Sequence, residues 1–90
     1  MAEFYREIIE EPGFSQQFQQ IQPDPQLADM ILDNVKTSLS LFPEETGVFD
    51  PEFDIWVTSV MFHTISGIEI AFLYYSFDEK AVYLIAIETQ

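Results

Sequence analysis

The sequence predicts an α+β domain in which a short N-terminal strand and two helices, one short and one long, precede a three-stranded antiparallel meander. Two observations predict this class. Two proline-bounded stretches in the first half carry apolar residues at helical spacing, and three apolar runs in the second half follow the strand period of two. Because helices and later strands are segregated along the chain, we expect the helices to pack on one face of the sheet. A chain of 90 residues holds one core, so residues 1–90 are expected to form a single domain.

The chain begins with a predicted short strand and a short helix. Residues 4–11, FYREIIEE, alternate in the strand pattern, although one helical turn is the alternative. Pro12 ends this element, because proline lacks the donor that a strand ladder needs. A short amphipathic helix is expected next, with Ser15 available as its N-cap. Its apolar residues recur at i, i+4 and i+7: Phe14, Phe18 and Ile21.

The longest helix is predicted to start after a second proline-rich break. Asp24 can cap it and Pro25 can occupy its first position, where the missing N–H costs nothing. Pro43 ends it. About 18 residues at 1.5 Å each give roughly 27 Å, enough to cross one face of a small sheet. The apolar stripe consists of Leu27, Met30, Ile31, Val35, Leu39 and Phe42.

Residues 43–54 are predicted to form an extended loop that concentrates acids. Its carboxylates are Glu44, Glu45, Asp50, Glu52 and Asp54. The alternating acids at 50, 52 and 54 resemble the start of an EF-hand calcium loop, but Ile55 replaces the required glycine, so we reject that motif. Phe49 and Phe53 interleave with the acids and are expected to tuck against the domain; an exposed acidic and aromatic binding loop is the alternative.

The alternating pattern of residues 55–65 predicts a strand. We expect Ser66 and Gly67 to form a turn that leads into an apolar hairpin over Ile68–Glu88. Asp78 opens the DEKA link, where its side chain can bond the turn backbone. Both faces of both hairpin strands are apolar by the period of two, so we expect central strands covered on each side. The two faces of the first strand are Ile68, Ile70, Phe72 and Tyr74 against Ala71, Leu73, Tyr75 and Phe77; those of the second are Val82, Leu84 and Ala86 against Tyr83, Ile85 and Ile87.

The charge balance constrains the partners. Sixteen acids against three basic residues give a net charge of −13, which opposes direct binding to a nucleic-acid backbone. The same field attracts a basic protein, although a solvated acidic surface is the commoner explanation. No apolar run has the length of a membrane helix, and the N-terminus carries acid where a signal peptide carries basic residues. Together with the absence of cysteine, this predicts a soluble cytoplasmic protein.

A short helix, a long helix ending at a proline and the C-terminal pattern GIEIAFLYYSFDEKAVYLIAIE resemble the RelE/ParE toxin superfamily. The resemblance covers most of the chain as a pattern and is close over residues 67–88. It implies that fold and a toxin–antitoxin context. The RelE-type ribonucleases that this pattern resembles use Lys and Arg residues on their middle strands to bind and cleave messenger RNA. Here residues 55–65 contain neither, and Ala71 falls near the usual strand Arg, so no family catalytic residue is carried over.

Other catalytic chemistry finds little support in the sequence. His63 is the single histidine, and a structural or exposed role is commoner for such a residue than general-base or metal-ligand chemistry. We therefore expect no cofactor, no metal site and no RNA cleavage. Three hypotheses follow: a non-catalytic protein-interaction domain on a RelE/ParE-like scaffold, used for self-association or for a partner; an acidic inhibitor that imitates nucleic acid and blocks a basic protein; and a working toxin. The candidate binding residues are Glu44, Glu45, Asp50, Glu52, Asp54, Phe49 and Phe53.

Overall fold

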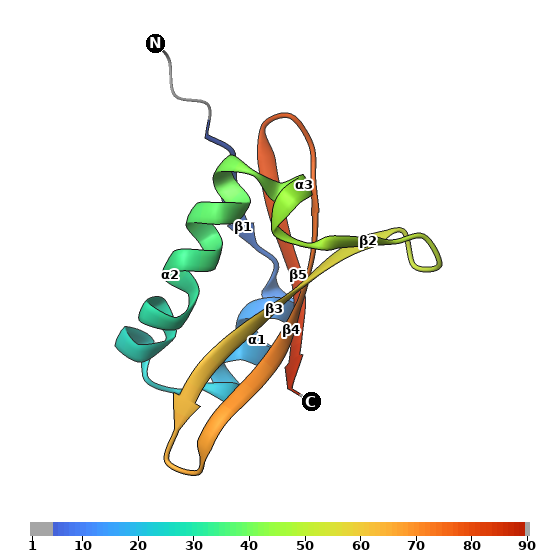
Figure 1. The fold of residues 1–90 in the computed structure, drawn as a ribbon. Coiled ribbons are helices and arrows are strands. Elements are labelled where there is room, and N and C mark those ends of the chain that lie inside the picture. Colours follow the sequence, from blue (N-terminus) through green and yellow to red (C-terminus); the bar gives the residue numbers. More distant parts are fainter. Residues whose placement is uncertain (1–4, 90) are drawn as a thin grey trace.

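A computed structural model gives the fold and describes residues 5–89. In chain order the elements are strand β1 (Glu7–Glu10), helix α1 (Pro12–Ile21), helix α2 (Pro25–Leu41), helix α3 (Pro43–Thr46) and strands β2 (Val48–Asp50), β3 (Ile55–Thr64), β4 (Gly67–Phe77) and β5 (Ala81–Thr89) (Figure 1). The predicted α+β class is confirmed. Within the described residues, none of these helices has the length and apolar character needed to cross a membrane.

The five strands form one mixed sheet in the order β1-β5-β4-β3-β2. Strands β2 to β5 are antiparallel neighbours, whereas β1 pairs with β5 in parallel and places Glu7 beside Ala81. The predicted three-stranded meander is therefore extended at both ends, by β2 at one edge and by the predicted N-terminal strand at the other. Backbone bonds from Arg6 to Ser40 and from Glu7 to Lys80, 3.0 and 2.9 Å long, hold β1 between α2 and β5.

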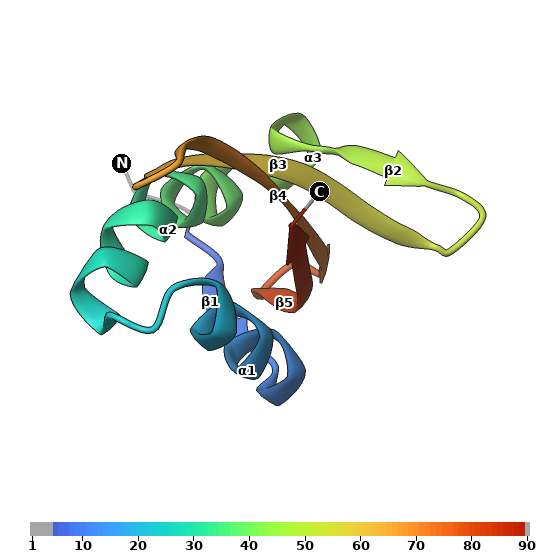
Figure 2. The same ribbon diagram turned by 90° about the horizontal axis from the view of Figure 1, so that it is seen from below.

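Helices α1 and α2 lie on the same side of the twisted sheet (Figure 2). The core between them and the sheet contains Phe14, Phe18, Leu32, Leu39, Val60, Phe62, Leu73, Tyr75, Leu84 and Ile87. Neither helix covers the other side, which we call the open face; on β2, β3 and β4 it consists of Val48, Asp50, Ile55, Val57, Ser59, Met61, His63, Ile68, Ile70, Phe72, Tyr74 and Ser76. The expectation that the hairpin is covered on both faces was therefore wrong, because both long helices pack on one side.

The helix boundaries follow from the prolines. Pro25 occupies the first turn of α2, and the Asp24 carboxylate accepts a 2.9 Å bond from the Gln26 N–H, as predicted. Helix α1 begins earlier than expected. Pro12 occupies its first turn, so Ser15 is not an N-cap but lies inside the helix, where its hydroxyl donates to Glu10 over 3.1 Å.

Residues 43–54 are more ordered than the predicted loop. Pro43 ends α2 but starts the short helix α3, and Gly47 leads directly into β2. The Tyr75 hydroxyl donates to the Pro43 carbonyl over 2.7 Å, and the Thr58 hydroxyl donates to the Thr46 carbonyl over 3.0 Å. These two bonds fasten α3 to the sheet, and burial of the ring raises the pKa of Tyr75 to about 12.

A β-bulge changes the predicted faces of β5. Tyr74 lies opposite Ala86 and Tyr75 lies opposite Leu84, which leaves Ile85 as an extra residue. Beyond the bulge the alternation shifts by one position, so Val82, Leu84 and Ile87 are all buried while Ala86 faces the open side. The predicted grouping of Ala86 with Val82, and of Ile87 with Tyr83, was wrong for this reason.

Candidate interaction surface

The acids predicted as binding residues lie around β2, and the structure does not gather them into one site. Glu44 and Glu45 are in the first turn of α3, and Asp50 ends β2 on the open face. Glu52 and Asp54 are exposed in the turn between β2 and β3, where the Asp50 carboxylate accepts a 2.9 Å bond from the Glu52 N–H. Strand β2 separates the first pair from the turn, so these acids form an extended charged border.

The two aromatic residues of this segment are exposed, which corrects the expectation that they tuck against the domain. Phe53 sits in the turn with 71% of its surface exposed. Phe49 remains 45% exposed, although its ring lies 5.4 Å from that of Trp56. The β2–β3 hairpin projects past both long helices (Figure 2), so no core is available to bury these rings.

The open face is mainly apolar. The sheet register places Val57 beside Tyr74, Ser59 beside Phe72 and Met61 beside Ile70. Val48, Met61 and Ile68 on this face are largely exposed, and Ile55, Val57, Ile70 and Phe72 are partly buried. Contiguous apolar surface of this kind, framed by polar residues, is typical of a protein interaction site.

Few charges reach the open face. On β2 to β5 its carboxylates are Asp50 and Glu88, and Glu88 accepts a 2.6 Å hydrogen bond from the Tyr74 hydroxyl. This bond raises the pKa of Tyr74 and occupies the carboxylate. The basic residues of the chain lie elsewhere: Arg6 lies over the Phe77 ring, Lys36 pairs with Glu10 over 2.6 Å, and Lys80 lies in the β4–β5 turn.

Among the strands of residues 5–89, none lies beside one sheet edge next to this face. Strand β2 pairs with β3 only from Ile55 to Val57, so β3 continues alone on that side over residues 58–64, which we call the free edge. The Thr58 hydroxyl donates to the Thr46 carbonyl there, but beyond Thr58 no strand of the described part of the chain pairs with this side of β3. Alternate residues of such an edge present backbone N–H and C=O groups that can accept another strand.

A depression of about 400 Å³ lies where β2 leaves β3. It opens between the end of α3, the free edge and the open face, and its lining is uncharged: Thr46, Gly47, Val48, Val57, Thr58, Ser59 and Phe72. The depression thus connects the free edge with the open face.

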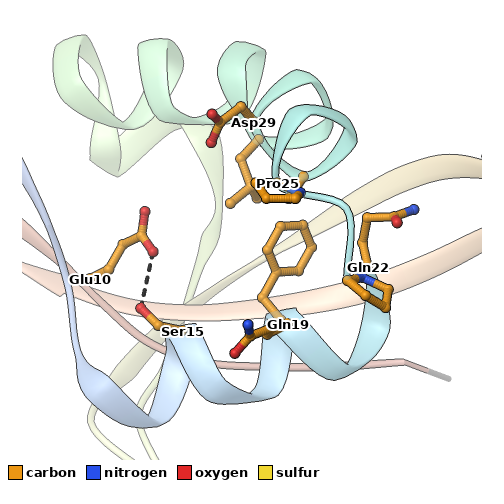
Figure 3. A pocket seen from close by; sticks show the side chains of 10 residues that line it. Glu10, Ser15, Gln19, Gln22, Pro25 and Asp29 are labelled. Carbon is orange, nitrogen blue, oxygen red and sulfur yellow. Dashed lines mark hydrogen bonds between the residues drawn. The ribbon is translucent and has the colours of Figure 1, made fainter.

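A second pocket, of about 180 Å³, lies between α1 and α2 (Figure 3). The Ser15 hydroxyl points toward Glu10 (Figure 3), and buried Phe18 is among the residues that line the pocket. Glu10 already binds both Ser15 and Lys36, so it is engaged in joining α1 and β1 to α2. We therefore assign the residues around this pocket to the contact between α1, α2 and β1, and not to a binding site.

His63 lies exposed on the open face opposite Ile68. Across residues 5–89, no three His, Asp or Glu side chains come together in a way that would hold a metal ion. Comparison with protein-family models, with curated protein sequences and with solved structures gives no match. The alternation of residues in the sequence identifies the side chains of the open face. It does not predict the free edge, which depends on how short the pairing of β2 with β3 is.

Proposed function

We propose that this protein is a non-catalytic interaction domain that self-associates through the open face and the free edge. The observation that carries the proposal is a nearly uncharged apolar sheet face on a chain of net charge −13. Two like-charged copies repel each other over most of their surface, and this face is where they can approach while bringing few carboxylates together. Apolar burial there then supplies the attraction.

The scaffold is proposed to be RelE/ParE-like, on the strength of the resemblance of residues 67–88 and the order of strand, two helices and later strands. The proposal does not include the ribonuclease activity of that superfamily. Strand β3 contains no Lys or Arg that could stabilise a phosphoryl transition state.

The test is the mass of the protein in solution, measured by sedimentation equilibrium up to high micromolar concentration at low and physiological salt. We expect an oligomer in both salts, because an apolar contact responds weakly to screening. Met61→Glu should dissociate it, since the new carboxylates meet on a face that carries few charges. Met30→Glu is the matched control: Met30 is 71% exposed on α2 and Met61 is 68% exposed on the open face.

The acidic-inhibitor hypothesis and the self-association proposal predict different results for a variant that lacks the candidate acids. Replacing Glu44, Glu45, Asp50, Glu52 and Asp54 by their amides should leave self-association intact, because four of these residues lie outside the open face. A strictly monomeric wild-type protein would contradict the proposal. Oligomers that disappear in the amide variant while its circular dichroism is unchanged would transfer the binding role to the acids.

A further inference from the structure

We propose that two copies join by antiparallel pairing of their β3 free edges, around a two-fold axis that passes beside Met61. The two sheets then continue into one another. This inference rests on the proposed self-association and names the contact that makes it.

The free edge lacks the devices that keep sheet edges apart. Residues 58–64 contain no Lys, no Pro and no carboxylate, and the β3–β4 register runs from Trp56 to Thr64 without a bulge. Natural sheets guard exposed edges with these features because an unguarded edge templates another strand. At about 3.3 Å per residue the free edge is roughly 23 Å long, the length of an ordinary strand.

The charges around the edge favour a second copy as the occupant. Helix α2 contacts β1 on one flank, where Lys36 bonds Glu10, and contacts β3 as well. At 100° per residue, the opposite flank of α2 carries only uncharged residues: Leu27, Ile31, Asn34 and Ser38. The edge itself offers a basic partner no carboxylate with which to pair. A second copy of an acidic chain meets an identical edge without charge repulsion.

The sheet geometry selects the register. Directly opposed residues of antiparallel strands place their side chains on the same face. A two-fold axis at Met61 therefore pairs Met61 with its own copy and Ser59 with His63 of the second copy, and it joins the two open faces on one side. Helices α1 and α2 of both copies then lie on the other side.

This register also gives a place to Ile65, the most exposed large apolar side chain of the described residues, at 108%. Ile65 follows Thr64 in the β3–β4 turn. With His63 of the second copy opposite Ser59, that turn arrives at the uncharged depression, which Val48, Val57 and Ser59 help to line. The depression and the exposed isoleucine are then complementary parts of one contact.

The absence of native cysteine makes disulfide trapping a clean test. Single variants Met61→Cys, Ile70→Cys, Phe72→Cys and Met30→Cys are oxidised mildly and resolved by non-reducing electrophoresis. Opposed Cα atoms at 4.5–5.5 Å fit a disulfide, so Met61→Cys should shift largely to a band of twice the mass. In edge pairing the two Ile70 positions are three strand spacings apart, about 14 Å, which is too far. Met30→Cys measures random collision.

The register is tested by mixing. Ser59→Cys and His63→Cys should each crosslink weakly alone, because identical positions are about 13 Å apart along the strands, and crosslink strongly when mixed. Amide exchange over residues 58–64 should also slow as the protein concentration is raised.

Oligomers that crosslink through Ile70 or Phe72 and not through Met61 would overturn edge pairing in favour of face packing. A wild-type protein that stays monomeric would instead overturn the self-association on which the inference rests.

Discussion

At the scale of single residues, Gly47 is held in the most confined position among the glycines. Its φ of −136° suits any residue, so its role is steric rather than conformational. A Cβ atom there would press into the Val57 carbonyl and lie 2.6 Å from the Tyr75 hydroxyl. Gly47 therefore permits both the close approach of α3 to β3 and the Tyr75–Pro43 hydrogen bond.

We predict that Gly47→Ala lowers the free energy of unfolding by about 1–3 kcal/mol, the usual cost of forcing extra volume into a packed site. Urea denaturation measures it. Gly13→Ala is the control: its Cβ would meet only the Ile85 carbonyl, at 3.9 Å, and alanine favours the helix by about 1 kcal/mol. Equal stability of the two variants would contradict the prediction, because it would mean that α3 shifts to accommodate the methyl group without loss of stability.

At the scale of elements, Asp78 organises the β4–β5 turn. Its carboxylate accepts 2.8 Å bonds from the N–H groups of both Lys80 and Ala81, as the sequence predicted, and a 3.2 Å bond from the Tyr83 hydroxyl. The two backbone bonds lower the pKa of Asp78, and the bond to Asp78 raises the pKa of Tyr83.

We predict that thermal stability at neutral pH falls in the order wild type, Asp78→Asn, Asp78→Ala, because the amide oxygen keeps an acceptor that alanine lacks. The folded state favours the carboxylate, so its contribution is fully present above the ordinary pKa of 3.8 and is lost as pH falls through the lowered pKa. The gap between wild type and Asp78→Asn should therefore shrink in acid. A gap that widens in acid would argue against this role.

The sequence predicted elements that carry strong local signals and missed those set by tertiary contacts. Asp24 and Pro25 define the start of α2, and the alternation of β3 and β4 separates buried Leu73 from exposed Ile68. The β5 bulge has no local signal, since Ile85 is apolar like its neighbours, and the period of two continued through it. Strand β2 is only three residues long and depends on pairing with β3.

The sequence predicted the candidate site near β2, but it assigned the site to the acids and not to the apolar surface beside them. The acids and Phe53 are exposed there, whereas the uncharged surface lies on the adjoining strands. The sequence could show that Met61 and Ile70 alternate with core residues. It could not show which side the two helices would leave open, because either face of β4 is apolar enough to be buried.

At the scale of the whole molecule, repulsion among carboxylates opposes folding. We predict that the unfolding midpoint rises from about 0.01 M to about 1 M NaCl, as the screening length falls from about 30 Å to about 3 Å. Thermal denaturation at fixed protein concentration measures it. The five-amide variant carries −13 + 5 = −8 and should gain less from salt. An equal gain in both proteins would assign the effect to general salting-out.

The parallel pairing of β1 with β5 joins the first strand in sequence order to the last. Glu7 lies beside Ala81, so the sheet closes only when the last strand is available. During synthesis the N-terminal strand and both long helices leave the ribosome before the strands that cover their apolar sides, because β3, β4 and β5 come later in the chain. Folding to the native sheet therefore waits until β5 has been synthesised, and until then repulsion among carboxylates of the emerging chain, Glu10, Glu11, Asp29 and Asp33 among them, opposes its aggregation.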